Sequence, residues 1–209
     1  MMAIQDPAGG RVRLAQLEAS DREPLRRLFY RLSPETLYRR FMSPIARPEQ
    51  VRPDRLLDVD HRNREAIVAV DDGEIVGVAR YFRQPGSNEA ELAVVVADAW
   101  QRQGLATRML AALAEQASAA RIERFTLIMQ ADNRPILQLV RRVDPSARLA
   151  LSYGVYETTV PVAAFKTVPT EPSAGAAADR EEALSHCHKP ADLARAVSLC
   201  AAGLIAIFS

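Results

Sequence analysis

The sequence predicts one mixed-sheet α/β or α+β domain over residues 10–166, followed by an appended tail over residues 167–209. The chain has 209 residues, enough for one domain with a sizeable core. Its 48% hydrophobic and 25% charged residues are typical of a folded globular protein. Segments with strand and helix periodicity follow the order β-α-α-β-β-β-α-β-α-β-β, which favours helices packed against a sheet.

The first half of the domain is predicted to contain a strand, two helices and a hairpin. Ser20 and Asp21 offer a cap for the first helix, and Ser33 and Pro34 offer a cap and a first-turn proline for the second. The sequence Asp71-Asp72-Gly73 favours a tight hairpin turn. The expected elements are a strand over 11–18, helices over 21–32 and 34–42, an irregular segment over 44–64, and strands over 66–70 and 74–82.

The second half is predicted to alternate strands and helices and to close with a hairpin. Residues 91–97 are short and mostly apolar, as expected of a buried central strand. Residues 105–119 carry an apolar stripe at helical spacing, and Asp144-Pro145 should stop the next helix. The expected elements are a strand over 91–97, a turn over 98–104, a helix over 105–119, a strand over 125–130, a helix over 133–143, and hairpin strands over 148–152 and 155–160.

The composition changes after the predicted domain. Residues 168–179 (VPTEPSAGAAAD) are poor in large apolar side chains and are expected to form a linker. Pro190 could start a helix with a stripe made of Leu193, Val197, Cys200 and Leu204. Such a helix commonly docks on its own domain or contacts a second copy, so a monomer or a homodimer is expected.

Charge and cysteine content exclude several classes of protein. The 27 Lys and Arg against 26 Asp and Glu give a net charge of +1, so no nucleic acid or anionic membrane is expected as a partner. The 2 cysteines are too few for a disulfide framework. The first ten residues lack a secretion signal, and the longest uncharged stretch, 196–208, is shorter than the roughly 20 apolar residues of a membrane span. We therefore expect a cytoplasmic protein.

Residues 101–107 (QRQGLAT) carry the most informative motif, because they join the apolar strand to the helix that begins near Leu105. A helix N-terminus presents unpaired N–H groups and the positive end of the helix dipole, which favour a phosphate. Gly104 and Ala106 allow a close approach to the main chain, and Thr107 adds a hydroxyl donor. Alternatively, small residues simply suit any strand-to-helix connection. The sequence contains neither the P-loop pattern nor the Rossmann pattern.

At this motif the sequence resembles the GNAT superfamily of acetyl-CoA-dependent N-acetyltransferases. Gln101 to Ala106 match the Q/R-x-x-G-x-G/A pattern with which that family holds the coenzyme A pyrophosphate. The segments SPETLYRRFM and EAELAVVVADAWQRQGLATRML are similar to the catalytic domain of bacterial protein lysine acetyltransferases of the Pat type. The resemblance implies a mostly antiparallel central sheet flanked by helices, acetyl-CoA as co-substrate, no metal, and an amine acceptor, either a protein lysine or a small molecule.

The resemblance also implies roles for individual residues. The backbone of Val94, Val95 and Val96 would bond the pantetheine arm where two strands splay apart, and Asn133 would touch the arm or order its loop. The pyrophosphate would lie on Gln101, Arg102, Gln103, Gly104, Leu105, Ala106 and Thr107. Glu91 lies where relatives have their general base, and Glu89 is a rival on the same face. Presenting a lysine amine of pKa about 10.4 in neutral form at pH 7 costs roughly 4 to 5 kcal/mol, which a carboxylate helps to offset.

Two departures from the family pattern keep a second function open. Val140 stands where many members have a tyrosine acting as general acid, and Asp144-Pro145 replaces the usual Gly-Phe. A non-catalytic acyl-CoA sensor or scaffold would therefore be the alternative to an enzyme. An open splay beside Val94 to Val96, beginning at Glu91, would favour the enzyme.

Three other signals are interpreted as structural. His186, Cys187 and His188 lack the further ligands of a metal site, and His61 is expected to be a solvated loop residue. Tyr38 and Phe41 are expected to pack while Arg39 and Arg40 face water; alternatively, all four shape the acceptor pocket.

Overall fold

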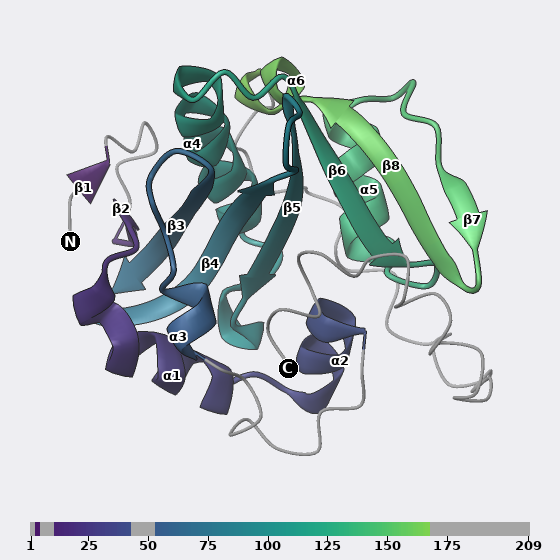
Figure 1. Cartoon of the computed structure of the whole chain (residues 1–209). Coiled ribbons are helices and arrows are strands. Elements are labelled where there is room, and N and C mark those ends of the chain that lie inside the picture. Colours follow the sequence, from purple (N-terminus) through teal and green to yellow (C-terminus); the bar gives the residue numbers. More distant parts are fainter. Residues whose placement is uncertain (1–2, 5–10, 43–52, 168–209) are drawn as a thin grey trace.

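The computed structural model describes residues 3–4, 11–42 and 53–167, whose strands form one eight-stranded sheet (Figure 1). The strand order is β1-β2-β3-β4-β5-β6-β8-β7, and every neighbouring pair is antiparallel except β5 and β6. The mixed, mostly antiparallel sheet is therefore confirmed. The strands are β1 (Ala3–Ile4), β2 (Arg13–Gln16), β3 (Arg64–Asp71), β4 (Glu74–Arg83), β5 (Glu89–Val96), β6 (Arg124–Gln130), β7 (Ala150–Ser152) and β8 (Val155–Pro161).

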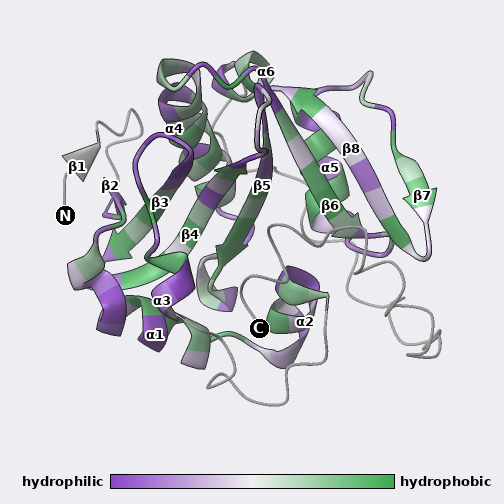
Figure 2. Cartoon of the chain, in the orientation of Figure 1, coloured by the Kyte–Doolittle hydropathy of each residue, from purple (hydrophilic) through white to green (hydrophobic). Residues whose placement is uncertain are grey.

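Helices cover both faces of the sheet. One hydrophobic core joins the sheet to α4, α5 and α6, and a second joins the other face to α1, α2 and α3. The sheet is thus the middle of three layers, and the outward side of α1 is hydrophilic in Figure 2. The helical elements are η1 (Ala19–Asp21), α1 (Arg22–Tyr30), α2 (Pro34–Phe41), α3 (Pro53–Leu56), η3 (Asp98–Trp100), α4 (Leu105–Ala119), α5 (Arg134–Val143) and α6 (Val162–Lys166).

Aromatic side chains anchor both cores. In the core around α4, the ring of Phe125 lies 5.9 Å from that of Tyr81 and 5.5 Å from that of Phe165, measured between centroids. In the core around α1 and α2, the rings of Phe29 and Phe41 are 5.8 Å apart. Burying each such side chain contributes about 1.5 to 3 kcal/mol, so these contacts hold α6 against the sheet and α2 against α1.

Local turn and cap signals explain where several elements begin. Ser33 accepts a hydrogen bond from the Thr36 amide at 3.2 Å and Pro34 opens α2, as predicted. The hairpin turn has positive φ at Asp72 and Gly73, as a two-residue turn between β3 and β4 requires. Asp21 does not cap α1 through its side chain. It accepts instead from the backbone amide of Glu18 at 2.9 Å, in a capping box around η1.

Three short elements differ from the expectations. The sheet begins at Ala3–Ile4, before residue 10, and α6 (Val162–Lys166) follows the closing hairpin. The segment expected to be irregular contains α3 (Pro53–Leu56). Each has five residues or fewer, too few for a periodic pattern to develop. The expected linker and tail helix lie outside the described residues, and no helix among those that are described is long and apolar enough to cross a membrane.

Candidate active site

The sheet opens between β5 and β6, which are the only parallel neighbours among the strands that the structure describes. The β5–β6 pairing covers three register positions, Glu89 with Arg124, Ala90 with Phe125 and Glu91 with Thr126, and no later ones. Beyond Glu91 the strands diverge, and Figure 1 shows them adjacent at one end and separated at the end where α2 lies. Glu91 is therefore at the point where the splay begins, and Val94, Val95 and Val96 line its β5 side.

Backbone groups of β5 face this open side. The amide of Ala97 donates to Val76 O on β4 at 2.8 Å. Because peptide groups alternate in direction along a strand, those of Val94 and Val96 point away from β4 and toward the splay. The Val96 carbonyl accepts a hydrogen bond from Gln101 Nε2 at 2.9 Å. The remaining groups at this edge could hydrogen-bond an extended ligand as a further strand would.

The loop after β5 presents a row of backbone donors. Arg102 and Gly104 both have positive φ (61° and 76°), and the turn they form brings the chain into α4 at Leu105. No residue among those described accepts a hydrogen bond from the amides of residues 102–107, and the first helical bond is Arg108 N to Gly104 O at 3.1 Å. Arg102 and Gln103 are exposed, whereas Thr107 is buried. The donors and the helix dipole suit an anion.

Glu91 is a half-buried carboxylate flanked by two arginines. Arg80 pairs in register with Ala93, two residues from Glu91 on the same face of the sheet, and Arg40 reaches this face from α2. Burial raises the pKa of Glu91 above its usual value, against the opposing effect of the Arg40 and Arg80 charges. Among the described residues none donates a hydrogen bond to Glu91, so its carboxylate is available to accept a proton.

Arg40 does not face water, contrary to the expectation that the α2 arginines are solvated. It is half-buried beside Glu91, because α2 packs against β5. The expected packing of Phe41 is confirmed, and Tyr38 is half-buried. Arg39 forms a different contact, an ion pair with Glu35 at 2.5 Å.

Glu89 has a different environment from Glu91. Its side chain is 40% exposed and lies 3.6 Å from Arg124 Nε in an ion pair. It stands at the first position of β5, before the strands separate. The geometry thus gives the two carboxylates different surroundings although they share one face of the strand.

A carboxylate at the end of β5 holds the start of α2. Asp98 accepts hydrogen bonds from the Ser33 amide at 2.9 Å, the Ser33 hydroxyl at 2.7 Å and the Thr36 hydroxyl at 2.8 Å. Burial acts to raise the pKa of Asp98, but these hydrogen bonds outweigh it and lower the pKa below its usual value. Gln101 Nε2 donates to Thr36 Oγ1 at 3.2 Å. The helix that carries Arg40 is therefore tied to the loop of residues 101–107.

The far side of the splay is closed by an apolar contact and by α5. Met42, just after α2, packs with Val155 of β8 and Ile128 of β6. Asn133 caps α5 through a long hydrogen bond from the Ile136 amide, at 3.5 Å. Val140 is buried in the core, and its aliphatic side chain carries no group that could protonate a leaving group.

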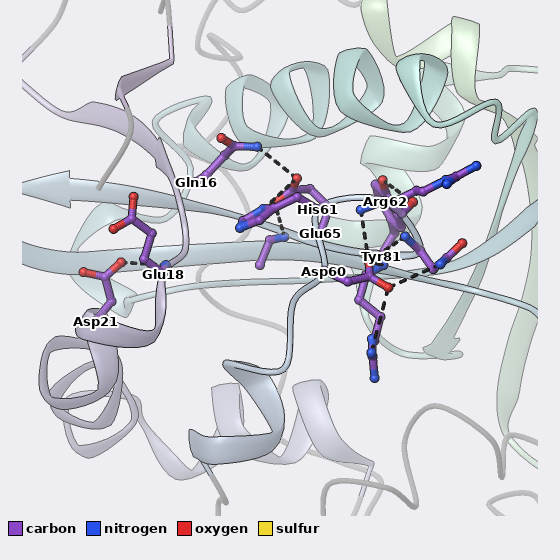
Figure 3. Close-up of polar contacts among 11 residues, drawn as sticks. Gln16, Glu18, Asp21, Asp60, His61, Arg62, Glu65 and Tyr81 are labelled. Carbon is purple, nitrogen blue, oxygen red and sulfur yellow. Dashed lines mark hydrogen bonds and ion pairs between the residues drawn. The ribbon is translucent and has the colours of Figure 1, made fainter.

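A second polar cluster lies away from the splay and was missed from the sequence (Figure 3). The Glu65 side chain is 0% exposed, and its carboxylate contacts His61 Nδ1 at 3.0 Å and accepts from Gln16 Nε2 at 3.0 Å. His61 is 43% exposed in the loop before β3, as expected of a solvated loop residue, and the contact with Glu65 is an addition to that expectation. The run RNRE reads as a charged loop, and nothing in it marks Glu65 as buried.

The described residues contain no group of three or more potential metal ligands, and His186, Cys187 and His188 lie outside them.

Comparisons with known proteins agree on the kind of protein. A model of the acetyltransferase (GNAT) family matches residues 27–143. The chain is 32% identical over 135 residues to acetyltransferase PA5475 of Pseudomonas aeruginosa, covering 63% of this chain and 73% of that protein. It is 31% identical over 144 residues to acetyltransferase Pat of Mycolicibacterium smegmatis, covering 67% of this chain but only 42% of that protein.

Solved structures show the same fold. The GNAT domain of S. lividans PAT superposes with a TM-score of 0.65 at 24% identity, covering 76% of this chain and 95% of that domain. A cAMP-binding acyltransferase from Mycobacterium smegmatis gives a TM-score of 0.55 at 25% identity, covering 82% of this chain and 50% of that one. This chain therefore corresponds to part of the longer relatives.

Proposed function

Because the chain belongs to the GNAT family of acetyltransferases, we propose that it transfers the acetyl group of acetyl-CoA to an amine by direct attack, with Glu91 as general base. Acetyl transfer by a GNAT-type enzyme follows from the family. The direct attack, the general base and the coenzyme-binding residues are what we propose in addition. The observation that carries it is the end of β5–β6 pairing at Glu91, which leaves a bare strand edge leading to the start of α4.

Acetyl-CoA would lie along this edge. The pantetheine amides would bond the outward peptide group of Val94 and the carbonyl of Val96, which leaves the Val96 N–H for the thioester oxygen, and the pyrophosphate would accept from the amides of residues 102–107. Gln101 would position the loop rather than touch the phosphate, since its amide already donates to Val96 O and Thr36 Oγ1. Asn133, as the cap of α5, would order the neighbouring turn.

In the reaction, Glu91 would take a proton from the ammonium group of the acceptor, directly or through water. The neutral nitrogen would attack the thioester carbonyl, and the Val96 amide would stabilise the oxyanion. The tetrahedral intermediate would then expel the coenzyme A thiolate, and its cationic nitrogen would lose a second proton to water to give the amide. Because Val140 supplies no acid, the thiolate would leave unprotonated or take a proton from water, which suits a thiol of pKa about 8.5. A raised pKa brings Glu91 closer to neutrality, where a general base works best.

A protein lysine is the proposed acceptor, by similarity to the relative named acetyltransferase Pat. A small-molecule amine is the alternative. The departures from the family pattern at Asp144 and at the buried Val140 do not favour either class of acceptor, because both residues lie on the α5 side of the splay.

Calorimetry with acetyl-CoA tests the binding site. Gly104→Glu should abolish saturable binding, because the carboxylate would occupy and repel the pyrophosphate position. Gly104→Asn is the matched control, since Asn tolerates positive φ better than other residues and adds no charge. The control should retain binding to within about tenfold. No binding by the native chain would overturn the proposal, as would equal binding by both variants.

Kinetics test the base. Glu91→Gln should reduce the acetylation rate by at least about tenfold, whereas Glu89→Gln should change it less than about threefold. The sensor alternative predicts acetyl-CoA binding with no release of free thiol over a broad panel of amines. An equal effect of both substitutions would show that Glu91 is not the base.

A further inference from the structure

We propose that Arg40 and Arg80 bind an anionic group, a carboxylate or phosphate, carried by the amine that this enzyme acetylates. The inference rests on the proposed function, because it concerns the acceptor side of the same site. The observation behind it is an excess of positive charge beside Glu91. Two half-buried guanidinium groups lie beside the carboxylate of Glu91, and this cluster of three groups carries a net charge of +1 when Glu91 is ionised. Asp58, whose charge also acts on Arg80, is ion-paired with Arg64.

The positive charge persists during the reaction. When Glu91 takes the proton of the acceptor ammonium, one positive charge leaves the nitrogen and the cluster changes from +1 to +2, so the cluster and the reacting nitrogen together stay at +2. An anion on the acceptor, held by the two arginines, would offset this charge both before and after the proton transfer, and would therefore favour binding of the acceptor.

The two arginines have hydrogen-bond donors to spare. A guanidinium group has five N–H donors. Arg80 uses one, at Nη1, in a long bond of 3.5 Å to the carbonyl of Arg55. Arg40 forms no hydrogen bond or ion pair with any residue that the structure describes, and its Cζ lies 5.0 Å from the centroid of the neighbouring Phe41 ring.

Other half-buried arginines of the same chain are paired. Arg64 pairs with Asp58, and even the exposed Arg31 is bonded to Glu74 and to the carbonyl of Ile75. Arg83 donates to the carbonyls of Ser87 and Ala120. Arg40 is the exception within the described part of the chain, at the position beside the proposed base.

The surroundings of the two arginines make an anion favourable. Burial lowers the pKa of Arg40 to about 10, helped by the nearby charge of Arg80, and burial also lowers the pKa of Arg80. Both groups stay cationic at neutral pH, so each has lost hydration without gaining a full set of partners. A carboxylate or phosphate accepts two parallel N–H bonds from a guanidinium and would replace that hydration.

The acceptor would thus present its amine to Glu91 and an anion to Arg40 and Arg80. Two sources share this chemistry: an acidic residue beside a protein lysine, and the acid group of a small amino acid. Matched acceptors separate them. The first pair is a lysine peptide with glutamate or glutamine next to the lysine. The second pair is β-alanine and its amide.

The test measures acetylation of both pairs by the full chain. In at least one pair, the acidic member should have a kcat/KM at least about tenfold higher than its amide. Arg40→Gln and Arg80→Gln should each reduce this ratio at least about fivefold, while calorimetry shows unchanged affinity for acetyl-CoA. Arg39→Gln is the matched control, because Arg39 is ion-paired with Glu35, and it should leave the ratio unchanged.

The outcomes distinguish this inference from the proposed function. If amines are acetylated but acid and amide react equally in both pairs, the inference is wrong and the function stands. The inference is also wrong if Arg40→Gln shifts only the pH dependence and leaves the ratio intact, since the arginines would then act on Glu91 alone. Absence of acetyl-CoA binding would overturn both.

Discussion

Replacing Glu65 by alanine should destabilise the fold strongly, because its fully buried carboxylate holds three donors from different parts of the chain. Gln16 donates from β2 at 3.0 Å, His61 contacts it from the preceding loop at 3.0 Å, and the Ala66 amide donates at 2.9 Å. Hydrogen bonds to a charged group contribute about 1.5 to 3 kcal/mol each. The His61 contact is discounted, because that side chain is 43% exposed and its charge is screened.

The Gln16 and Ala66 donors alone therefore predict a loss of about 3 to 6 kcal/mol in the free energy of unfolding, similar to other broken buried charge networks. Urea unfolding followed by circular dichroism measures it. Glu89→Ala is the matched control. Its carboxylate is 40% exposed and 3.6 Å from Arg124, so it should cost less than about 1 kcal/mol. A Glu65→Ala variant as stable as the control would refute the argument that this network supports the fold.

Three further outcomes are expected. Asp98→Ala should lower the free energy of unfolding by about 1 kcal/mol, because it removes the hydrogen bonds that hold the start of α2. The loosened α2 should lower kcat/KM for the amine more than it lowers the affinity for acetyl-CoA measured by calorimetry. A larger loss of acetyl-CoA affinity than of kcat/KM would contradict this expectation. Gly77→Ala should lower the free energy of unfolding measured in urea by about 1 to 3 kcal/mol, because the added Cβ would lie 3.2 Å from the backbone oxygen of Val95. A change near zero would show that the strands adjust to the added methyl group. Activity should fall as the pH drops through the raised pKa of Glu91. Arg40→Gln should move this fall to higher pH, because the substitution removes a positive charge that lowers the pKa of Glu91. A shift to lower pH would exclude a direct interaction between Arg40 and Glu91.

Local patterns were sufficient for most of the fold. Helix α4 has the predicted bounds, Leu105–Ala119, because its apolar stripe is long and Gly104 marks its start. The turn at Asp72 and Gly73 likewise fixed the hairpin. The short α6 carries no such pattern, since five residues hardly exceed one helical turn.

The site was predictable only in part, because its electrostatics arise between distant segments. The motif at residues 101–107 and the position of Glu91 could be read locally. The place of Arg40 beside Glu91 could not, because it depends on how α2 packs against β5. Glu65 was missed for the same reason, since its donors come from β2 and from a loop.

The parallel junction between β5 and β6 would link coenzyme binding to folding. Only three register positions join the antiparallel half β1–β5 to the half β6–β8, so this seam is a narrow hydrogen-bonded connection between the two halves of the sheet. A ligand lying along β5 would act as a replaceable strand, completing hydrogen bonds that the polypeptide leaves unmade. At one hundred times its dissociation constant such a ligand adds about 2.7 kcal/mol to global stability. The free enzyme would then open first along this seam, and coenzyme would protect the amides on both sides of it from hydrogen exchange.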